Sequence, residues 1–343
     1  MGKFKGAIVG DQHFCDRSPQ SRTDDYTQAI LGKMRWILTY CREKGIPHVF
    51  LLGDMFHFKQ PTHTSHWLVQ TVIGLFKEFQ PDVQAWTLVG NHDFTTNLKG
   101  LPRQPITTVL QSGAVHPMGL TGYPELFECG DFNVEVNGAP YRDGAPEDGS
   151  GGTEGDPTAY KLMYVDDKSF KVALYHATLL PDGDRFFGRY VNFGQAAPYI
   201  GAHFVGCGHY HPGYEPVVIE AHGKTWTNPG SISRGSAEDH NLIRPIRFVT
   251  FLYDGTLRTK VVEVPHRPGP AVFDVEALER RKEEDRQHSE FVEKLTADVA
   301  GSRDVSTVES LCRAVPELAG DPRVANLARE FLQRAAEMAE VTV

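Results

Sequence analysis

The N-terminal part of the chain alternates short apolar runs with longer amphipathic stretches. Ala7–Val9, Val49–Leu52 and Val83–Val89 are apolar runs of strand length, and each is followed by a glycine and then by Asp or Asn. Between these runs, residues 24–44 and 63–79 repeat apolar side chains at the spacing of an amphipathic helix. This alternation predicts an α/β fold with a parallel sheet and helices on its faces.

Strand-length apolar runs return in the second half of the chain. We expect strands at Lys171–Tyr175, His203–Val205, Val217–Ile219, Thr225–Thr227, Ile246–Tyr253 and Leu257–Val264. An Asp-Gly pair joins the last two as a hairpin. Before them, residues 144–157 are rich in Gly, Pro, Asp and Glu and contain no large apolar side chain. This composition predicts a flexible surface loop.

A proline-rich segment divides the chain. Residues 1–264 contain all of the predicted strands and are expected to form one domain, residues 265–270 form a hinge, and residues 271–343 form a charged helical tail. A second tail helix starting at Asp321 has a fuller apolar face and is predicted to dock on a partner. The alternative is that the tail packs on its own domain. The first tail helix carries an interrupted apolar stripe of Phe273, Leu278, Phe291, Val292 and Leu295.

Composition excludes some classes of protein. No apolar run approaches the roughly 18 residues that a membrane span needs, so no membrane association is expected. The five cysteines are scattered, without a CxxC pair, which favours a reducing cytoplasm. The net charge of −9 argues against a protein that coats nucleic acid by bulk charge. It does not exclude a nucleic-acid enzyme, because bound cations add local positive charge.

Short polar motifs follow the predicted strands. In an open α/β sheet, ligands bind outside the carboxyl ends of the strands, so these motifs are expected to meet at one site. Their carboxylates, amide and imidazoles are the donors that bind first-row divalent metals. Each motif alone is common by chance, but all of them in order at strand ends indicate a metal site. The motifs are Asp11-Gln12-His13, Gly53-Asp54, Gly90-Asn91-His92-Asp93, His176 and Gly208-His209-Tyr210-His211.

This series resembles the calcineurin-like metallophosphoesterase superfamily. The resemblance implies a four-layer αββα sandwich over residues 1–264, with a helical extension after it, and two metal ions at the strand ends. It implies that His92 is catalytic and is not a ligand. It further implies a first metal held by Asp11, His13, Asp54 and His211, and a second held by Asp54, Asn91, His176 and His209.

Phosphoester chemistry is consistent with these roles. Two divalent cations can clamp the phosphate oxygens and activate a water molecule, and the shared Asp54 would offset the repulsion between them. His92 could protonate or stabilise the leaving oxygen, since an imidazole titrates near neutral pH. Mixed imidazole and carboxylate ligation favours Mn²⁺, with Fe, Zn or Mg as alternatives.

Two further stretches are similar to the DNA double-strand-break repair exonuclease subunits of SbcD type. They are Gly53–Pro61, which contains His57, and Asn228–Arg234. The resemblance implies that His57 lies beside the catalytic histidine, that DNA is the substrate and that an SbcC-like coiled-coil ATPase binds the C-terminal helices. We also expect Arg234 to contact the substrate. The protein-phosphatase branch carries an Arg before its GNHE motif, whereas Val89 stands there in this chain.

Other interpretations stay open. The tail is too short to hold both a full DNA-binding cap and a pair of partner-binding helices, which leaves the mode of DNA binding undecided. A stand-alone phosphodiesterase or phosphatase on a small metabolite or phosphoprotein is one alternative, and a non-catalytic scaffold of the same fold is another. A homodimer is also compatible with the sequence. The segment Asp182–Tyr190 is expected to overhang the site and to bring Arg185, Arg189 and Tyr190 to the substrate, although these arginines could equally form surface ion pairs.

Overall fold

The computed structural model divides the chain into two compact units, Met1–Phe273 and Asp274–Val343. The predicted loop at 144–157 lies outside the described residues except at its last two positions, and so does the helix predicted from Asp321. The described residues are 2–19, 22–94, 98–141, 156–186, 188–237, 239–280, 282, 283, 286, 287 and 289.

The first unit contains strands and helices in alternation along the chain. Its strands are β1 (Phe4–Val9), β2 (His48–Leu51), β3 (Gln84–Thr87), β4 (His116–Pro117), β5 (Glu125–Glu128), β6 (Asn133–Ala139), β7 (Phe170–His176), β8 (Leu179–Leu180), β9 (Val191–Asn192), β10 (Phe204–Gly208), β11 (Val218–Ala221), β12 (Lys224–Thr227), β13 (Arg247–Tyr253) and β14 (Leu257–Glu263). Its α-helices are α1 (Tyr26–Glu43), α2 (His66–Lys77), α3 (Pro105–Gln111), α4 (Phe193–Ala196) and α5 (Asp239–Ile243).

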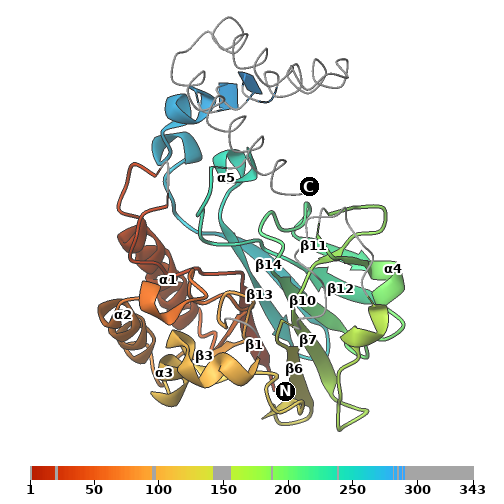
Figure 1. Ribbon diagram of the computed structural model, residues 1–343. Coiled ribbons are helices and arrows are strands. Elements are labelled where there is room, and N and C mark those ends of the chain that lie inside the picture. Colours follow the sequence, from red (N-terminus) through yellow and green to blue (C-terminus); the bar gives the residue numbers. More distant parts are fainter. Residues whose placement is uncertain are drawn as a thin grey trace, which may run out of the picture. The chain divides into compact units, whose positions relative to one another are not determined.

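Two six-stranded sheets form the centre of the unit (Figure 1). The first has the order β14-β13-β1-β2-β3-β4, in which β1 to β4 are parallel and the hairpin of β13 and β14 is antiparallel. The second has the order β11-β12-β10-β7-β6-β5, with a parallel centre and an antiparallel strand at each edge. Strands β8 and β9 pair separately.

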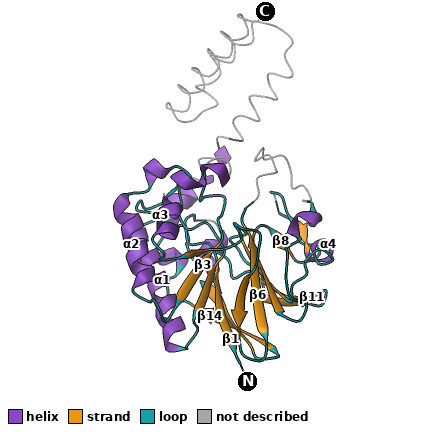
Figure 2. Cartoon of the chain, turned by 90° about the horizontal axis from the view of Figure 1, so that it is seen from below, coloured by secondary structure: helices purple, strands orange, loops and turns teal. Residues whose placement is uncertain are grey.

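Three apolar clusters separate four layers. One cluster joins α1, α2 and α3 to the outer face of the first sheet, and a second fills the space between the two sheets, with Ile8 and Phe50 on one side and Val172 and Phe204 on the other. The third covers the outer face of the second sheet with α4 and nearby loops. Figure 2 shows α1 to α3 together on one side of the strands and α4 on the opposite side. The predicted αββα sandwich is therefore confirmed.

Helix α1 illustrates how the local sequence produces this arrangement. Asp25 caps it by accepting a hydrogen bond from the Gln28 backbone N–H at 3.0 Å. Ile30, Met34 and Ile37 recur at helical spacing and are fully buried against the first sheet. The helical pattern in the sequence thus reflects a face that the sheet covers.

Strands β5 and β6 were not predicted from the sequence. Strand β6 lies inside the second sheet, yet it carries the buried polar residues Glu135 and Asn137. Glu135 accepts hydrogen bonds from the backbone N–H groups of Val165 and Asp166 at 2.6 and 2.7 Å. Because those partners come from a distant segment, the apolar pattern of the strand is broken without leaving a buried charge unpaired.

The boundary between the units differs from the predicted one. Val272 and Phe273 were assigned to the tail, but both are only 3% exposed and belong to the first unit. The Val272 carbonyl accepts a hydrogen bond from the Thr23 N–H at 3.0 Å, and the Arg22 guanidinium lies over the Phe273 ring. Phe273 is therefore the last residue of the first unit and packs within it. No helix in the described part of the chain is long and apolar enough to cross a membrane.

Candidate metal centre

The predicted ligands lie at the carboxyl ends of five strands. Asp11 follows β1, Asp54 follows β2 and Asn91 follows β3, while His176 ends β7 and His209 follows β10. All five strands belong to the parallel parts of the two sheets, so their carboxyl ends point the same way. The site therefore spans the edge shared by both sheets.

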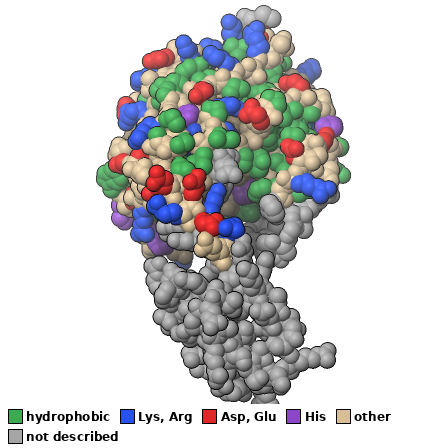
Figure 3. Space-filling view, turned by 90° about the horizontal axis from the view of Figure 1, so that it is seen from above, with side chains coloured by type: hydrophobic (Ala, Val, Ile, Leu, Met, Phe, Trp, Pro, Cys, Tyr) green, Lys and Arg blue, Asp and Glu red, His purple; other side chains and the backbone are tan. Residues whose placement is uncertain are grey.

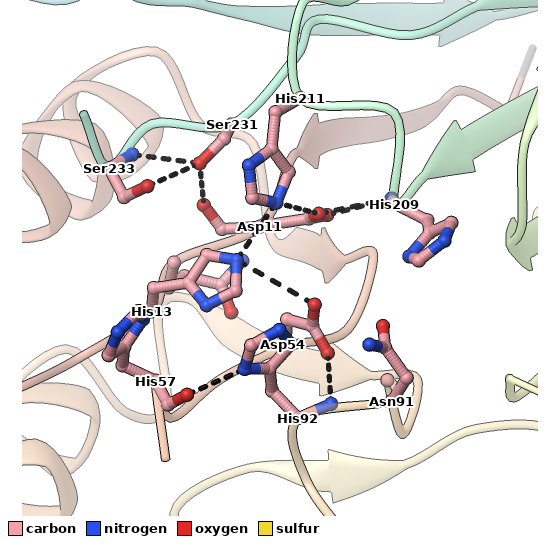
Figure 4. A network of polar contacts seen from close by, with 12 residues as sticks. Asp11, His13, Asp54, His57, Asn91, His92, His209, His211, Ser231 and Ser233 are labelled. Carbon is pink, nitrogen blue, oxygen red and sulfur yellow. Dashed lines mark hydrogen bonds and ion pairs between the residues drawn. The ribbon is translucent and has the colours of Figure 1, made fainter. Parts of the chain in front are cut away.

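One group of side chains converges on the space between Asp11 and Asp54 (Figure 4). The Nε2 atom of His211 lies 3.2 Å from Oδ2 of Asp11 and 3.0 Å from Nε2 of His13. The same His13 atom lies 3.6 Å from Oδ2 of Asp54. One atom from each of the four residues falls within 4.8 Å of all the others. These are the four residues predicted to share the first metal.

A second group forms on the other side of Asp54. The Nε2 atom of His176 lies 3.4 Å from Oδ2 of Asp54 and 3.0 Å from Oδ1 of Asn91. Asp54, His176 and His209 again place one ligand atom each within 4.8 Å of the others. The Nδ1 atom of His176 faces the carbonyl oxygen of Leu52 at 2.7 Å, which orients the ring with Nε2 toward the centre.

Asp54 belongs to both groups. Its Oδ1 atom accepts a hydrogen bond from the His92 backbone N–H at 2.8 Å. Its Oδ2 atom is buried, has no hydrogen-bond partner and lies between the imidazoles of His13 and His176. A buried carboxylate oxygen without a donor is costly unless a cation compensates it. The donor set and this oxygen therefore fit two divalent metal ions with Asp54 between them.

The charge state of the cluster agrees with that fit. Burial alone would raise the pKa of Asp54, but His176 and His13 hold the pKa well below its usual range. Burial alone would lower the pKa of His176, but Asp54 raises it to about 9. Burial lowers the pKa of His209 to about 4 and also lowers that of His13. Asp54 is thus ionised and the His13 and His209 imidazoles are neutral, which are the forms that bind metals, whereas His176 would release a proton when a metal binds.

Three of the ligand residues have a strained backbone. His13, Asp54 and His209 have φ angles of 49°, 50° and 70°, in the left-handed region that non-glycine residues seldom adopt. Such strain occurs mostly at functional sites, where the surrounding structure imposes it. A glycine precedes both Asp54 and His209, and at each of these glycines a side chain would collide with a ligand residue. A Cβ atom on Gly208 would lie 2.7 Å from Oδ1 of Asp11, and one on Gly53 would lie 2.5 Å from Nδ1 of His176.

The two predicted catalytic histidines are neighbours. The rings of His57 and His92 stack with centroids 5.8 Å apart, and the His13 ring lies 4.8 Å from that of His92. The Nδ1 atom of His92 lies 2.6 Å from the carbonyl oxygen of His57. Because a carbonyl only accepts, Nδ1 carries the proton and Nε2 is the basic nitrogen in the neutral ring.

Asp93 has a structural role that the sequence analysis did not assign. Its carboxylate accepts hydrogen bonds from the backbone N–H groups of Gly90 at 2.9 Å and of Met55 and Phe56 at 3.3 Å. It therefore ties the loop that carries Asn91 and His92 to the loop after Asp54. Burial raises its pKa to about 7. Its position at the end of the Gly90–Asp93 motif is the only sequence signal for this role.

The predicted substrate contacts lie in different environments. Arg185 and Arg189 are exposed, and between them the ring of Phe186 meets that of Tyr210 at 5.6 Å, next to the ligand histidines. Tyr190 is 7% exposed and packs in the apolar outer layer. The predicted substrate contact by Arg234 stays a prediction, and the structure shows which groups this side chain contacts. This side chain is 5% exposed and donates to the carbonyl oxygens of Arg267 and Arg244 at 2.8 and 2.5 Å.

Comparisons with known proteins do not supply a function. No family model and no curated protein matches the chain. The fold is similar to that of a dimetal phosphatase from Danio rerio, with 12% identity over 78% of this chain and 100% of that chain and a TM-score of 0.48. It is also similar to the calcineurin-like phosphoesterase YfkN from Bacillus subtilis, with 11% identity over 78% of this chain and 93% of that chain and a TM-score of 0.43. A third similar structure is GAP50, the anchor in the inner membrane complex of Plasmodium, with 14% identity over 77% of this chain and 85% of that chain and a TM-score of 0.42. At such scores these similarities carry no inference about activity.

Proposed function

We propose that this chain is a phosphoester hydrolase that works with two divalent metal ions. The observation that carries the proposal is the position of Asp54, whose buried Oδ2 atom has no hydrogen-bond partner and lies between two separate groups of ligand side chains. A single structural metal would need only one of these groups. Two ions supply Lewis-acid chemistry in such sites, because they neutralise the phosphate oxygens and lower the pKa of a water molecule.

The chain's own residues account for the remaining steps. The His57 carbonyl fixes the tautomer of His92, so that in the protonated imidazole the Nε2–H can donate to the leaving oxygen. The Asp54 carboxylate and the His92 backbone are joined by a hydrogen bond, which holds this histidine at a fixed place relative to the ligands. Proton donation to an alkoxide leaving group therefore falls to His92.

The finer proposal is a DNA phosphodiesterase of SbcD type that uses Mn²⁺. Its support is the resemblance of Gly53–Pro61 and Asn228–Arg234 to those nuclease subunits. Two contacts are consistent with functional roles for these stretches, because His57 stacks on His92 and the Ser231 hydroxyl donates to the Asp11 carbonyl at 2.9 Å. An SbcC-like ATPase bound through the tail is part of this proposal.

Charge favours a second candidate, a phosphatase or phosphodiesterase acting on a small substrate. The chain carries a net charge of −9. On the face shown in Figure 3, acidic, basic and apolar side chains are interspersed in the described part of the surface. A nuclease is ordinarily helped by a positive surface that binds the DNA backbone, whereas a small phosphoester needs only the site itself.

Competing substrates separate the two candidates. The Mn²⁺-loaded chain would be assayed on linear and hairpin DNA, on bis(p-nitrophenyl) phosphate and on p-nitrophenyl phosphate. The DNA proposal expects cleavage of DNA and of the diester, with little hydrolysis of the monoester. Efficient monoester hydrolysis without DNA cleavage would support the small-substrate candidate. The control pair is Asp54→Asn, expected to be inactive, and Asp167→Asn, whose side chain is fully exposed and which is expected to be active.

A further inference from the structure

A second polar site lies away from the metal centre. A cavity of about 270 Å³ opens between α1, the segment before it, the loop that ends at Arg234 and the segment Pro265–Arg267. Four arginine or lysine side chains line it, namely Arg22, Lys33, Arg234 and Arg267. Among the described residues that line the cavity, Asp24 supplies the only carboxylate. The lining therefore carries a large excess of positive charge.

Three of these cations are buried. Lys33 is 8% exposed, Arg234 is 5% exposed and the side chain of Arg22 is 2% exposed. Arg22 forms a two-point ion pair with Asp24 at 2.7 and 2.8 Å, which neutralises one charge. Burying a cation without a counter-charge is costly, so the remaining charges indicate a missing anion.

Backbone carbonyls position these groups without neutralising them. The Lys33 ammonium donates to the Ile232 carbonyl at 2.7 Å, which uses one of its three N–H donors. Arg234 donates to two carbonyls, and its own carbonyl accepts from Arg22 at 3.0 Å. The cations are thus held in place from several elements, as in a binding site that exists before its ligand arrives.

The electrostatics of Lys33 agree with an absent counter-ion. Burial, together with the charges of Arg22 and Arg234, lowers the pKa of Lys33 to about 7. An anion in the cavity would favour the charged ammonium and reverse this shift. The mutual repulsion of the three cations would be relieved at the same time.

We propose that this cavity binds a small phosphate-class oxyanion. Guanidinium and ammonium groups are the side chains that recognise phosphate. A dianion matches the two charges that remain when Asp24 is set against the three buried cations. The burial of Lys33 and Arg22 restricts the ligand to a small one, either free phosphate or a small phosphomonoester. This site is independent of the proposed hydrolase activity.

A loop connects the cavity to the metal centre. Arg234 ends the segment in which the Ile232 N–H donates to the Asp11 carbonyl at 3.1 Å and the Ser231 N–H donates to the His211 carbonyl at 3.1 Å. An anion held by Lys33 and Arg234 would fix the far end of this loop. Since phosphate would also bind metal ions at the other site, a test of the cavity requires metal-free protein.

Thermal unfolding of the full, chelator-treated chain with increasing inorganic phosphate tests the proposal. A ligand of the folded state raises the melting temperature along a saturating curve, whereas general salt stabilisation is non-saturating. We expect saturation in the wild type. We expect it to be lost in Lys33→Met, which removes a buried charge and leaves an apolar chain of similar size. Exposed Arg267→Ala should weaken binding severalfold by calorimetry without a risk to folding.

The matched control is Lys224→Met. Lys224 also donates to a single carbonyl, that of Ala202 at 3.1 Å, but it does not line the cavity, so its variant should bind phosphate as the wild type does. Glycerol phosphate is the second probe. Binding equal to or tighter than that of phosphate assigns a monoester, and binding of phosphate alone assigns the free ion. A non-saturating response, or equal responses in the wild type and Lys33→Met, overturns the proposal.

Discussion

The Nδ1–H group of His92 donates to the backbone carbonyl of His57 at 2.6 Å, while the His92 backbone N–H donates to the carboxylate of Asp54. The catalytic candidate is thus held at both ends by main-chain hydrogen bonds. One of these bonds leads to the shared ligand, and the other leads to a carbonyl that no side-chain substitution at position 57 removes.

Replacing His92 by Ala should abolish most turnover without releasing metal, because the side chain acts on the leaving group. Loss of a general acid ordinarily lowers the rate by about 10²- to 10⁴-fold. His57→Ala should have a smaller effect, since the carbonyl that orients His92 stays in place. Steady-state rates on a diester substrate, with metal content measured on the same samples, check both expectations. Metal loss in His92→Ala would show that the role assignment is wrong.

Glycine 208 should be intolerant of a side chain. In Gly208→Ala the Cβ atom would meet Oδ1 of Asp11 at 2.7 Å and the carbonyl oxygen of Leu52 at 2.8 Å, so the ligand must move. We expect weaker metal binding and a loss of about 1–3 kcal/mol in the free energy of unfolding. The matched control is Gly74→Ala within helix α2, where nothing lies within 4 Å and alanine should stabilise by up to about 1 kcal/mol. Equal effects of the two substitutions would contradict this account.

The buried Lys33 should make stability depend on pH. Its pKa is about 7 in the folded chain and has an ordinary value of 10.5, so between these values the unfolded chain binds more protons. Lys33 therefore makes the free energy of unfolding increase as the pH rises from about 7 to 10.5. Urea unfolding of metal-free and phosphate-free protein should show that the advantage of Lys33→Met over the wild type shrinks from pH 6.5 to pH 9.5. The control is exposed Lys3→Met; a constant advantage for Lys33→Met would refute the prediction.

Truncation after Phe273 should leave a folded metal centre. Val272 and Phe273 are buried in the first unit, and every candidate ligand precedes them. The shortened chain is expected to keep its metals and its rate on a small diester, and to lose only the proposed ATPase partner. Truncation after Arg267 removes both apolar residues and should destabilise the chain. If the first truncation also loses metal or precipitates, the tail contributes to the catalytic unit and the docking proposal fails.

The apolar runs in the sequence predicted the strands whose residues are buried by their own apolar side chains. The strand ends that hold Asp11, Asp54 and His176 follow apolar runs that are buried on both faces, so they could be found from the sequence. Strand β6 could not, because Glu135 is satisfied by backbone groups some thirty residues further along the chain.

Long-range partners also determine the environments of Arg234 and Phe273, which local patterns could not predict. An arginine in a loop near a metal site is a reasonable candidate for a phosphate contact. Its actual partners, the carbonyls of Arg244 and Arg267, depend on how the loop packs against the later segment. Phe273 was grouped with the tail because it follows the prolines, whereas its contact with Arg22 depends on the folded N-terminal loop.

The central claim is that Asp54 joins two metal sites, and metal stoichiometry tests it most directly. The full chain would be loaded with Mn²⁺, freed of excess metal and analysed for metal per protein, beside Asp54→Asn and the exposed control Asp167→Asn. The account predicts about two ions per chain in the wild type and in Asp167→Asn, with a marked loss in Asp54→Asn. One ion or none in the wild type, or two ions retained by Asp54→Asn, would contradict it.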